Sequence, residues 1–127
     1  MSARVLVVDD DANALYGFAE ALRRRLPGVR VDTALSPVRA LVQLEHTQFD
    51  IVVTDFWMPS MNGLSLLRRV KAMQPHCAVF LMTGCDLGLR EQASQLGARG
   101  FAEKPVVLED FVLQLKQVLL ERPSPAV

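Results

Sequence analysis

The chain is short of cysteine and of net charge, and each shortage excludes a class of protein. It has two cysteines among 127 residues, Cys77 and Cys85, with no CxxC motif or metal-ligand spacing, so we expect reduced thiols in a cytoplasmic protein. Its 14 Lys and Arg residues balance its 14 Asp and Glu residues, which removes the electrostatic reason to expect direct contact with nucleic acid. The first apolar run, residues 5–8, is far too short for a signal peptide or a membrane span.

The sequence also lacks internal repeats, low-complexity segments and any linker that would separate two domains. Half of its residues are apolar, which is enough to build one core in a chain of this length. We therefore expect a single domain over residues 1–122. The Pro-rich residues 123–127 are expected to form a disordered tail.

Apolar runs alternate with helical periodicity along the chain. Five runs are predicted as buried strands, and they cover residues 5–8, 29–34, 49–54, 77–82 and 99–102. Apolar residues at helical spacing follow these runs, as in a short helix predicted over residues 87–96 and a long one over residues 108–121. This alternation predicts an α/β fold, in which a doubly wound parallel sheet carries helices on both faces.

Polar side chains stand where the predicted strands end. They are Asp9, Asp10 and Asp11 after the first strand, Asp55 after the third, Thr83 after the fourth and Lys104 after the fifth. Ligand sites in open α/β sheets lie outside the carboxyl ends of the strands. We therefore expect several carboxylates, a hydroxyl and an ammonium group to converge at one edge of the sheet.

Such a set of groups favours a particular chemistry. Crowded carboxylates repel one another and raise each other's pKa, which costs stability unless a cation is bound. Oxygen ligands supplied by few protein groups suit Mg²⁺, which keeps several waters and accompanies phosphate-bearing partners. Phosphoryl transfer needs mainly positioning and charge neutralisation, so the pattern predicts a Mg²⁺-dependent phosphoryl site.

The ordered motifs VLVVDDD, TDFWMPSMNG, FLMTG and GFAEKP resemble those of a known family. This family is the receiver domain of two-component response regulators, in particular the single-domain chemotaxis regulators. The resemblance extends over about residues 4–121. It implies a flavodoxin-like fold with strand order 2-1-3-4-5, and a phosphoryl-accepting switch rather than an enzyme.

The resemblance also implies roles for individual residues. Asp55 matches the acceptor that takes a phosphoryl group from the phosphohistidine of a histidine kinase. The ligands of Mg²⁺, or of Mn²⁺ in its place, would be Asp9, Asp10, Asp55 and the backbone carbonyl of Trp57. Asp11 is expected to cap a helix rather than to bind the metal.

The remaining matched positions would bind the phosphoryl group, change conformation after phosphorylation or shape the loop that follows Asp55. Thr83 and Lys104 match the hydroxyl and the ammonium group that contact the phosphoryl oxygens, and Phe101 matches the aromatic residue that turns inward afterwards. The loop positions that match are Met58, Pro59 and Gly63.

Partners follow from the same resemblance. We expect phosphoryl transfer from a histidine kinase or phosphotransfer protein, and output to a downstream protein or a homodimer, with no membrane contact. The output surface would be formed by the segments 87–96, 99–102 and 108–121. Leu113 and Leu120 fall off the predicted core stripe of the last segment, so they are expected on this surface or as scattered exposed residues.

Two other interpretations of the same residues remain open. In the first, the domain is a pseudo-receiver that is never phosphorylated and serves only as a docking module. In the second, the chain is a haloacid-dehalogenase-type phosphatase with Asp9 as the nucleophile. The second interpretation leaves Asp55 and the Met58-Pro59 pair without a role.

Overall fold

The computed structural model describes residues 2–121, so the predicted tail 123–127 lies outside the described residues. Its strands are β1 (Arg4–Val8), β2 (Arg30–Ala34), β3 (Ile51–Asp55), β4 (Ala78–Thr83) and β5 (Gly100–Glu103). Its helices are α1 (Ala12–Arg25), α2 (Pro37–His46), α3 (Gly63–Met73), α4 (Leu89–Gln95) and α5 (Leu108–Glu121). Within this part of the chain, no helix is both long and apolar enough to span a membrane.

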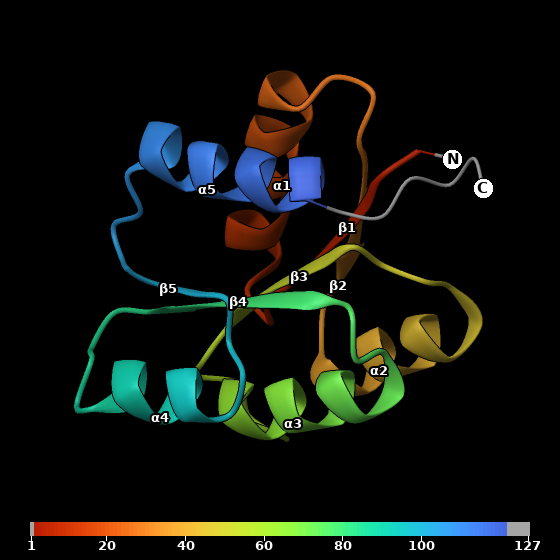
Figure 1. Cartoon of the computed structure of the whole chain (residues 1–127). Helices are drawn as coiled ribbons and strands as arrows, with labels where there is room; N and C mark the ends of the chain where they lie inside the picture. Colours follow the sequence, from red (N-terminus) through yellow and green to blue (C-terminus); the bar gives the residue numbers. More distant parts are fainter. Residues whose placement is uncertain (1, 122–127) are drawn as a thin grey trace.

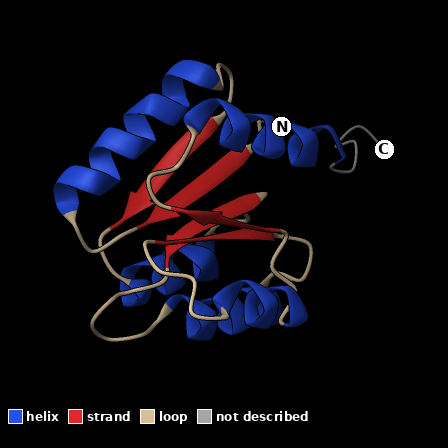
Figure 2. Ribbon diagram, turned by 90° about the vertical axis from the view of Figure 1, so that its left-hand side faces the viewer, coloured by secondary structure: helices blue, strands red, loops and turns tan. Residues whose placement is uncertain are grey.

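The strands form one parallel sheet in the order β2-β1-β3-β4-β5, as the resemblance implied. Helices α1 and α5 cover one face of this sheet, and α2, α3 and α4 cover the other (Figures 1 and 2). The chain reverses its direction of travel across the sheet after β2, so β1 and β3 become neighbours. In folds of this kind the functional site lies at that switch point, beyond the carboxyl ends of the strands.

The core has two layers, one on each side of the sheet. Strands β1, β3 and β4 are buried on both faces, which explains why they appear in the sequence as continuous apolar runs. In α5 the predicted core face is confirmed, because Phe111, Val112 and Leu115 are buried. The apolar residues of α2 differ in their burial, since Leu41 is buried whereas Val38 is exposed.

Helix starts follow the capping side chains that the sequence offers. Asp11 accepts hydrogen bonds from the backbone N–H groups of Asn13 and Ala14 at 3.0 and 3.3 Å, so its expected role as a helix cap is confirmed. Helix α4 is shorter than the predicted span 87–96. It begins only at Leu89, because Gly88 before it adopts the left-handed conformation with φ of +82° and supplies no capping side chain.

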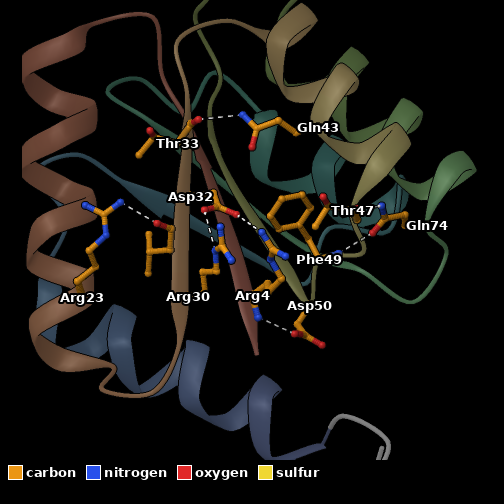
Figure 3. A network of polar contacts seen from close by, with 11 residues as sticks. Arg4, Arg23, Arg30, Asp32, Thr33, Gln43, Thr47, Phe49, Asp50 and Gln74 are labelled. Atoms are coloured by element: carbon orange, nitrogen blue, oxygen red, sulfur yellow. Dashed lines mark hydrogen bonds and ion pairs between the residues drawn. The ribbon is translucent and has the colours of Figure 1, made fainter. Parts of the chain in front are cut away.

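A polar network joins β1, β2 and the segment before β3 (Figure 3). Arg4 donates its backbone N–H to Asp50 at 2.8 Å and its guanidinium to Asp32 at 2.8 Å. The buried Gln74 accepts from the N–H of Phe49 at 2.9 Å and donates to the backbone carbonyls of Leu44, in the last turn of α2, and of Thr47, just after it. These contacts join β1 to β2 and to the residue that precedes β3, and through Gln74 they join Phe49 to the end of α2.

Candidate functional site

The carboxyl ends of β1 and β3 bring three carboxylates together. Asp9 follows β1 directly and Asp55 is the last residue of β3, its neighbour in the sheet. Asp9, Asp10 and Asp55 each offer one oxygen, and these oxygens lie within 4.8 Å of one another. Asp9 and Asp55 are buried, whereas Asp10 is exposed to solvent. The convergence expected from the sequence is therefore observed for these three carboxylates.

Lys104 closes the cluster from the side of β5. Its Nζ atom lies 2.8 Å from Oδ1 of Asp55 and 3.8 Å from Oδ2 of Asp9. Its backbone N–H donates to the carbonyl of Thr83 at 2.8 Å, which fixes the position of its Cα beside the end of β4. The ammonium group thus compensates part of the negative charge at the sheet edge.

The site perturbs two of its ionisable groups. Burial raises the pKa of Asp9, and the negative charges of Asp55 and Asp10 act in the same direction, while the N–H of Asp11 and the charge of Lys104 oppose them. Burial alone would lower the pKa of Lys104. The hydrogen bond to Asp55 and the surrounding carboxylates outweigh that effect, so the pKa of Lys104 is raised. Lys104 therefore stays charged, and ionised Asp9 is held at a cost.

Thr83, the last residue of β4, is fully buried, and its hydroxyl is bonded to the loop that follows. The hydroxyl donates to the carbonyl of Cys85 at 3.1 Å and accepts from the N–H of Cys85 at 3.2 Å. Side chains alternate along a strand, so Thr83 lies on the same face of the sheet as Leu81 and its register partner Phe101. The Cys85 contact could not be predicted from the sequence, because Cys85 takes part in it with backbone atoms alone.

The loop after Asp55 is folded tightly against the strand end. The N–H of Phe56 donates to the carbonyl of Met82 at 2.9 Å, and the N–H of Gly63 donates back to the carbonyl of Phe56 at 2.8 Å. A Cβ atom on Gly63 would lie 2.9 Å from the carbonyl oxygen of Asp55, a contact with rigid backbone. Gly63 is therefore required for the close approach of α3 to the backbone of Asp55.

The other loop positions differ in their burial. Met58 is buried in the core layer that contains α2, α3 and α4, whereas Pro59 is exposed. Trp57 is 56% exposed, and its ring meets the ring of Phe56 edge-on with centroids 4.6 Å apart. The side chain of Met58 thus anchors the loop, and the Trp57 indole faces solvent two residues beyond Asp55.

The donor set fits a hard divalent cation. Three carboxylate oxygens on adjacent strand ends match the oxygen ligands that Mg²⁺ prefers, and the exposed Asp10 leaves room for the waters that Mg²⁺ retains. The described residues offer no thiol or imidazole at this cluster, which disfavours zinc.

The whole chain was compared with known proteins. A family model described as "Response regulator receiver domain" matches residues 5–116. The chain belongs to this family. It is 34% identical to the "Transcriptional regulatory protein PrrA" of Mycobacterium leprae (strain TN), an alignment that covers 98% of this chain and 53% of that protein. It thus spans about half the length of the curated relatives it matches.

Solved structures of receiver domains agree with the fold. The CheY-like receiver domain from Methanospirillum hungatei JF-1 superposes with a TM-score of 0.87 at 27% identity, covering 95% of this chain and 96% of that one. The beryllofluoride-activated NtrC4 receiver domain, solved as a dimer, gives a TM-score of 0.83 at 31% identity, covering 93% and 97% of the two chains.

Membership of this family favours the receiver-domain interpretation over the phosphatase interpretation. Receiver domains of two-component response regulators are phosphoacceptor switches that interact with histidine kinases and downstream effectors, and they are not conventional enzymes. The phosphatase interpretation of Asp9 is not favoured by any of these matches. Family membership does not by itself assign roles to the individual residues of this receiver domain.

Proposed function

We propose that Asp55 is the phosphoryl acceptor of this receiver domain. The observation that carries the proposal is the position of Asp55 within the three-carboxylate cluster, with the ammonium group of Lys104 2.8 Å from its Oδ1 atom. A carboxylate at the edge of the sheet can be reached by a phosphoryl donor. The ammonium group beside it can bind the negatively charged oxygens of the phosphoryl group after transfer.

The transfer proposed is a displacement at phosphorus. A carboxylate oxygen of Asp55 attacks the phosphorus of a phosphohistidine, a new O–P bond forms, and the P–N bond to the imidazole breaks. The imidazole leaves with the electron pair of that bond and takes a proton from solvent. The product is an acyl phosphate on Asp55, whose added oxygens and charge are partners for Lys104.

A divalent cation completes this site in the proposal. Asp9, Asp10, Asp55 and the backbone carbonyl of Trp57 would hold Mg²⁺, or Mn²⁺ in its place. When bound, the cation neutralises the charge of the carboxylates and of the phosphoryl oxygens. The raised pKa of Asp9 supports this assignment, because it marks a carboxylate whose charge the folded protein leaves undercompensated.

The switch that we propose uses Thr83, Lys104 and Phe101. Phosphoryl oxygens on Asp55 offer Thr83 an acceptor with more charge than the carbonyl of Cys85, its present partner. Thr83 and Phe101 share one face of the sheet, so a displaced Thr83 leaves space that Phe101 can enter. Phosphorylation then shifts the population of conformations on the surface of α4, β5 and α5.

This surface is where we place the output partner, either a downstream protein or a second copy of the chain. Leu113 and Leu120, 64% and 87% exposed, lie one heptad apart on α5 and add apolar area to it. The input partner would be a histidine kinase or phosphotransfer protein in the cytoplasm. Balanced charge favours protein partners over direct contact with nucleic acid. We also propose residues 1–122 as the receiver unit.

A mass measurement tests the proposal against the pseudo-receiver alternative. Treatment with acetyl phosphate and Mg²⁺ is expected to add the mass of one phosphoryl group to the intact protein. The same treatment with an excess of chelator is expected to add none, because the crowded carboxylates then lack the cation that neutralises them. A protein that stays unmodified in Mg²⁺ would be a docking module, and the proposed function would be wrong.

A further inference from the structure

An arginine of α4 lies on the aromatic ring of β5. The guanidinium carbon of Arg90 is 4.7 Å from the ring centroid of Phe101, within the range of a cation–π contact. The Nη1 atom of Arg90 also reaches the backbone carbonyl of Phe101, at 3.5 Å. Both contacts join the first turn of α4 to the residue that the proposed function names as the switch aromatic.

Asp86 in the β4–α4 loop orients this arginine. Its Oδ1 atom accepts from the backbone N–H of Arg90 at 3.1 Å, and its Oδ2 atom lies 3.7 Å from the Nε atom of Arg90. Asp86 is adjacent in sequence to Cys85, whose backbone holds the hydroxyl of Thr83. A continuous series of contacts therefore runs from Thr83 through the loop and Arg90 to Phe101.

Helix α4 is short, and its two buried residues belong to the core layer against which Phe101 packs. The helix has seven residues, its N-cap residue Gly88 supplies no capping side chain, and its buried residues are Leu89 and Ala93. Phe101 is half-buried against the core layer on this side of the sheet. The guanidinium of Arg90 adds a further contact between α4 and this half-buried ring.

We propose that Arg90 acts as a latch that holds Phe101 in its resting position and so opposes the phosphorylated conformation. The inference rests on the proposed function of Asp55, Thr83 and Phe101. The conformation described is the resting one, because Lys104 pairs with the Asp55 carboxylate itself and Thr83 bonds to its own loop. A ring that turns inward gives up the guanidinium, so the contact stabilises only the resting state.

Binding of beryllofluoride with Mg²⁺ measures this preference directly. Beryllofluoride is named as the activating ligand of the similar NtrC4 receiver domain. Trp57, the one tryptophan in the sequence, stands two residues from Asp55 and can report binding by its fluorescence. The Arg90→Met variant keeps the length and the apolar stem of the side chain but loses the cation. It is expected to bind beryllofluoride about two- to five-fold more tightly than the wild type.

Three further variants identify the cause of the change. Arg24→Met makes the same replacement at an exposed position of α1 and is expected to leave the affinity unchanged. Arg90→Lys keeps a cation beside the ring and is expected to fall between Arg90→Met and the wild type. In a Phe101→Leu background, Arg90→Met is expected to have no effect, because the latch then has no ring to hold.

The possible outcomes separate the latch from the proposed function. Equal or weaker binding by Arg90→Met, with normal binding by the wild type, overturns the latch and leaves the function of Asp55 intact. An equal gain in the Phe101→Leu background also overturns it, because Arg90 would then act through another group. A wild type that binds no beryllofluoride overturns the proposed function, and the latch with it.

Discussion

The Asp55→Asn variant is expected to take up no phosphoryl group from acetyl phosphate and Mg²⁺, which is a complete loss of modification rather than a reduced rate. The carboxylate of Asp55 supplies the attacking oxygen in the proposed reaction, and a neutral amide oxygen in its place neither attacks phosphorus readily nor leaves a stable acyl phosphate. The fold should survive, because Asn has nearly the same shape and can still meet the ammonium group of Lys104. Intact-mass analysis measures the loss, and thermal unfolding checks the fold.

Asp11→Asn is the matched control for this variant. It makes the same chemical change in the same acidic segment, but at a residue that caps α1 through hydrogen bonds to Asn13 and Ala14. Asn and Asp are equally good at such a position, so this variant should keep both its stability and its phosphorylation. Continued modification of Asp55→Asn at another residue would remove Asp55 from the role of acceptor.

The Asp9→Asn variant is expected to unfold at a higher temperature than the wild type when metal is absent. Burial raises the pKa of Asp9, so the folded protein binds that proton more tightly than the unfolded chain does. The stability linked to Asp9 is therefore greatest below its unfolded pKa and is lost as the pH rises through the folded pKa. At neutral pH the ionised form carries this cost and the amide does not. The melting temperature should rise by a few degrees.

Magnesium is expected to reverse that order. At a Mg²⁺ concentration ten times its dissociation constant, the wild type should gain about 1.4 kcal/mol of stability. Asp9→Asn lacks one of the carboxylates of the cluster and should gain much less. The control Asp11→Asn should gain as much as the wild type. Thermal unfolding with and without Mg²⁺ measures both effects, and a metal-free Asp9→Asn protein that melts below the wild type would contradict the charge-crowding argument.

Much of this architecture could be predicted from the sequence, because a small number of strong physical rules determine it. Strands buried on both faces must be continuous apolar runs, which is what the sequence has at β1, β3 and β4. Parallel strands place all their carboxyl ends on one edge, so Asp9, Asp55 and Lys104 could be predicted to lie on that edge. The contacts of the Lys104 ammonium group with the two carboxylates depend in addition on its side-chain conformation.

The parts that could not be predicted depend on local backbone geometry. Thr83 is held by the backbone of Cys85, and backbone atoms leave no trace in a sequence pattern. Arg90 lies on an exposed part of a short helix, where an arginine normally indicates only contact with solvent. Its contact with Phe101 depends on where α4 begins, and the helix begins at Leu89, two residues later than predicted. The conformation of the loop determines such contacts, and the helical periodicity of the segment does not predict them.

The central claim is that Asp55, and no other acid of the cluster, carries the phosphoryl group. The most direct measurement treats the wild type with acetyl phosphate and Mg²⁺, reduces the acyl phosphate with a hydride reagent, and maps the reduced residue in peptides. We expect position 55 to be reduced to the alcohol, and a chelator-treated sample to show no reduction at any position. Reduction at Asp9, the acid that the phosphatase interpretation names as nucleophile, or at Asp10 would contradict the account.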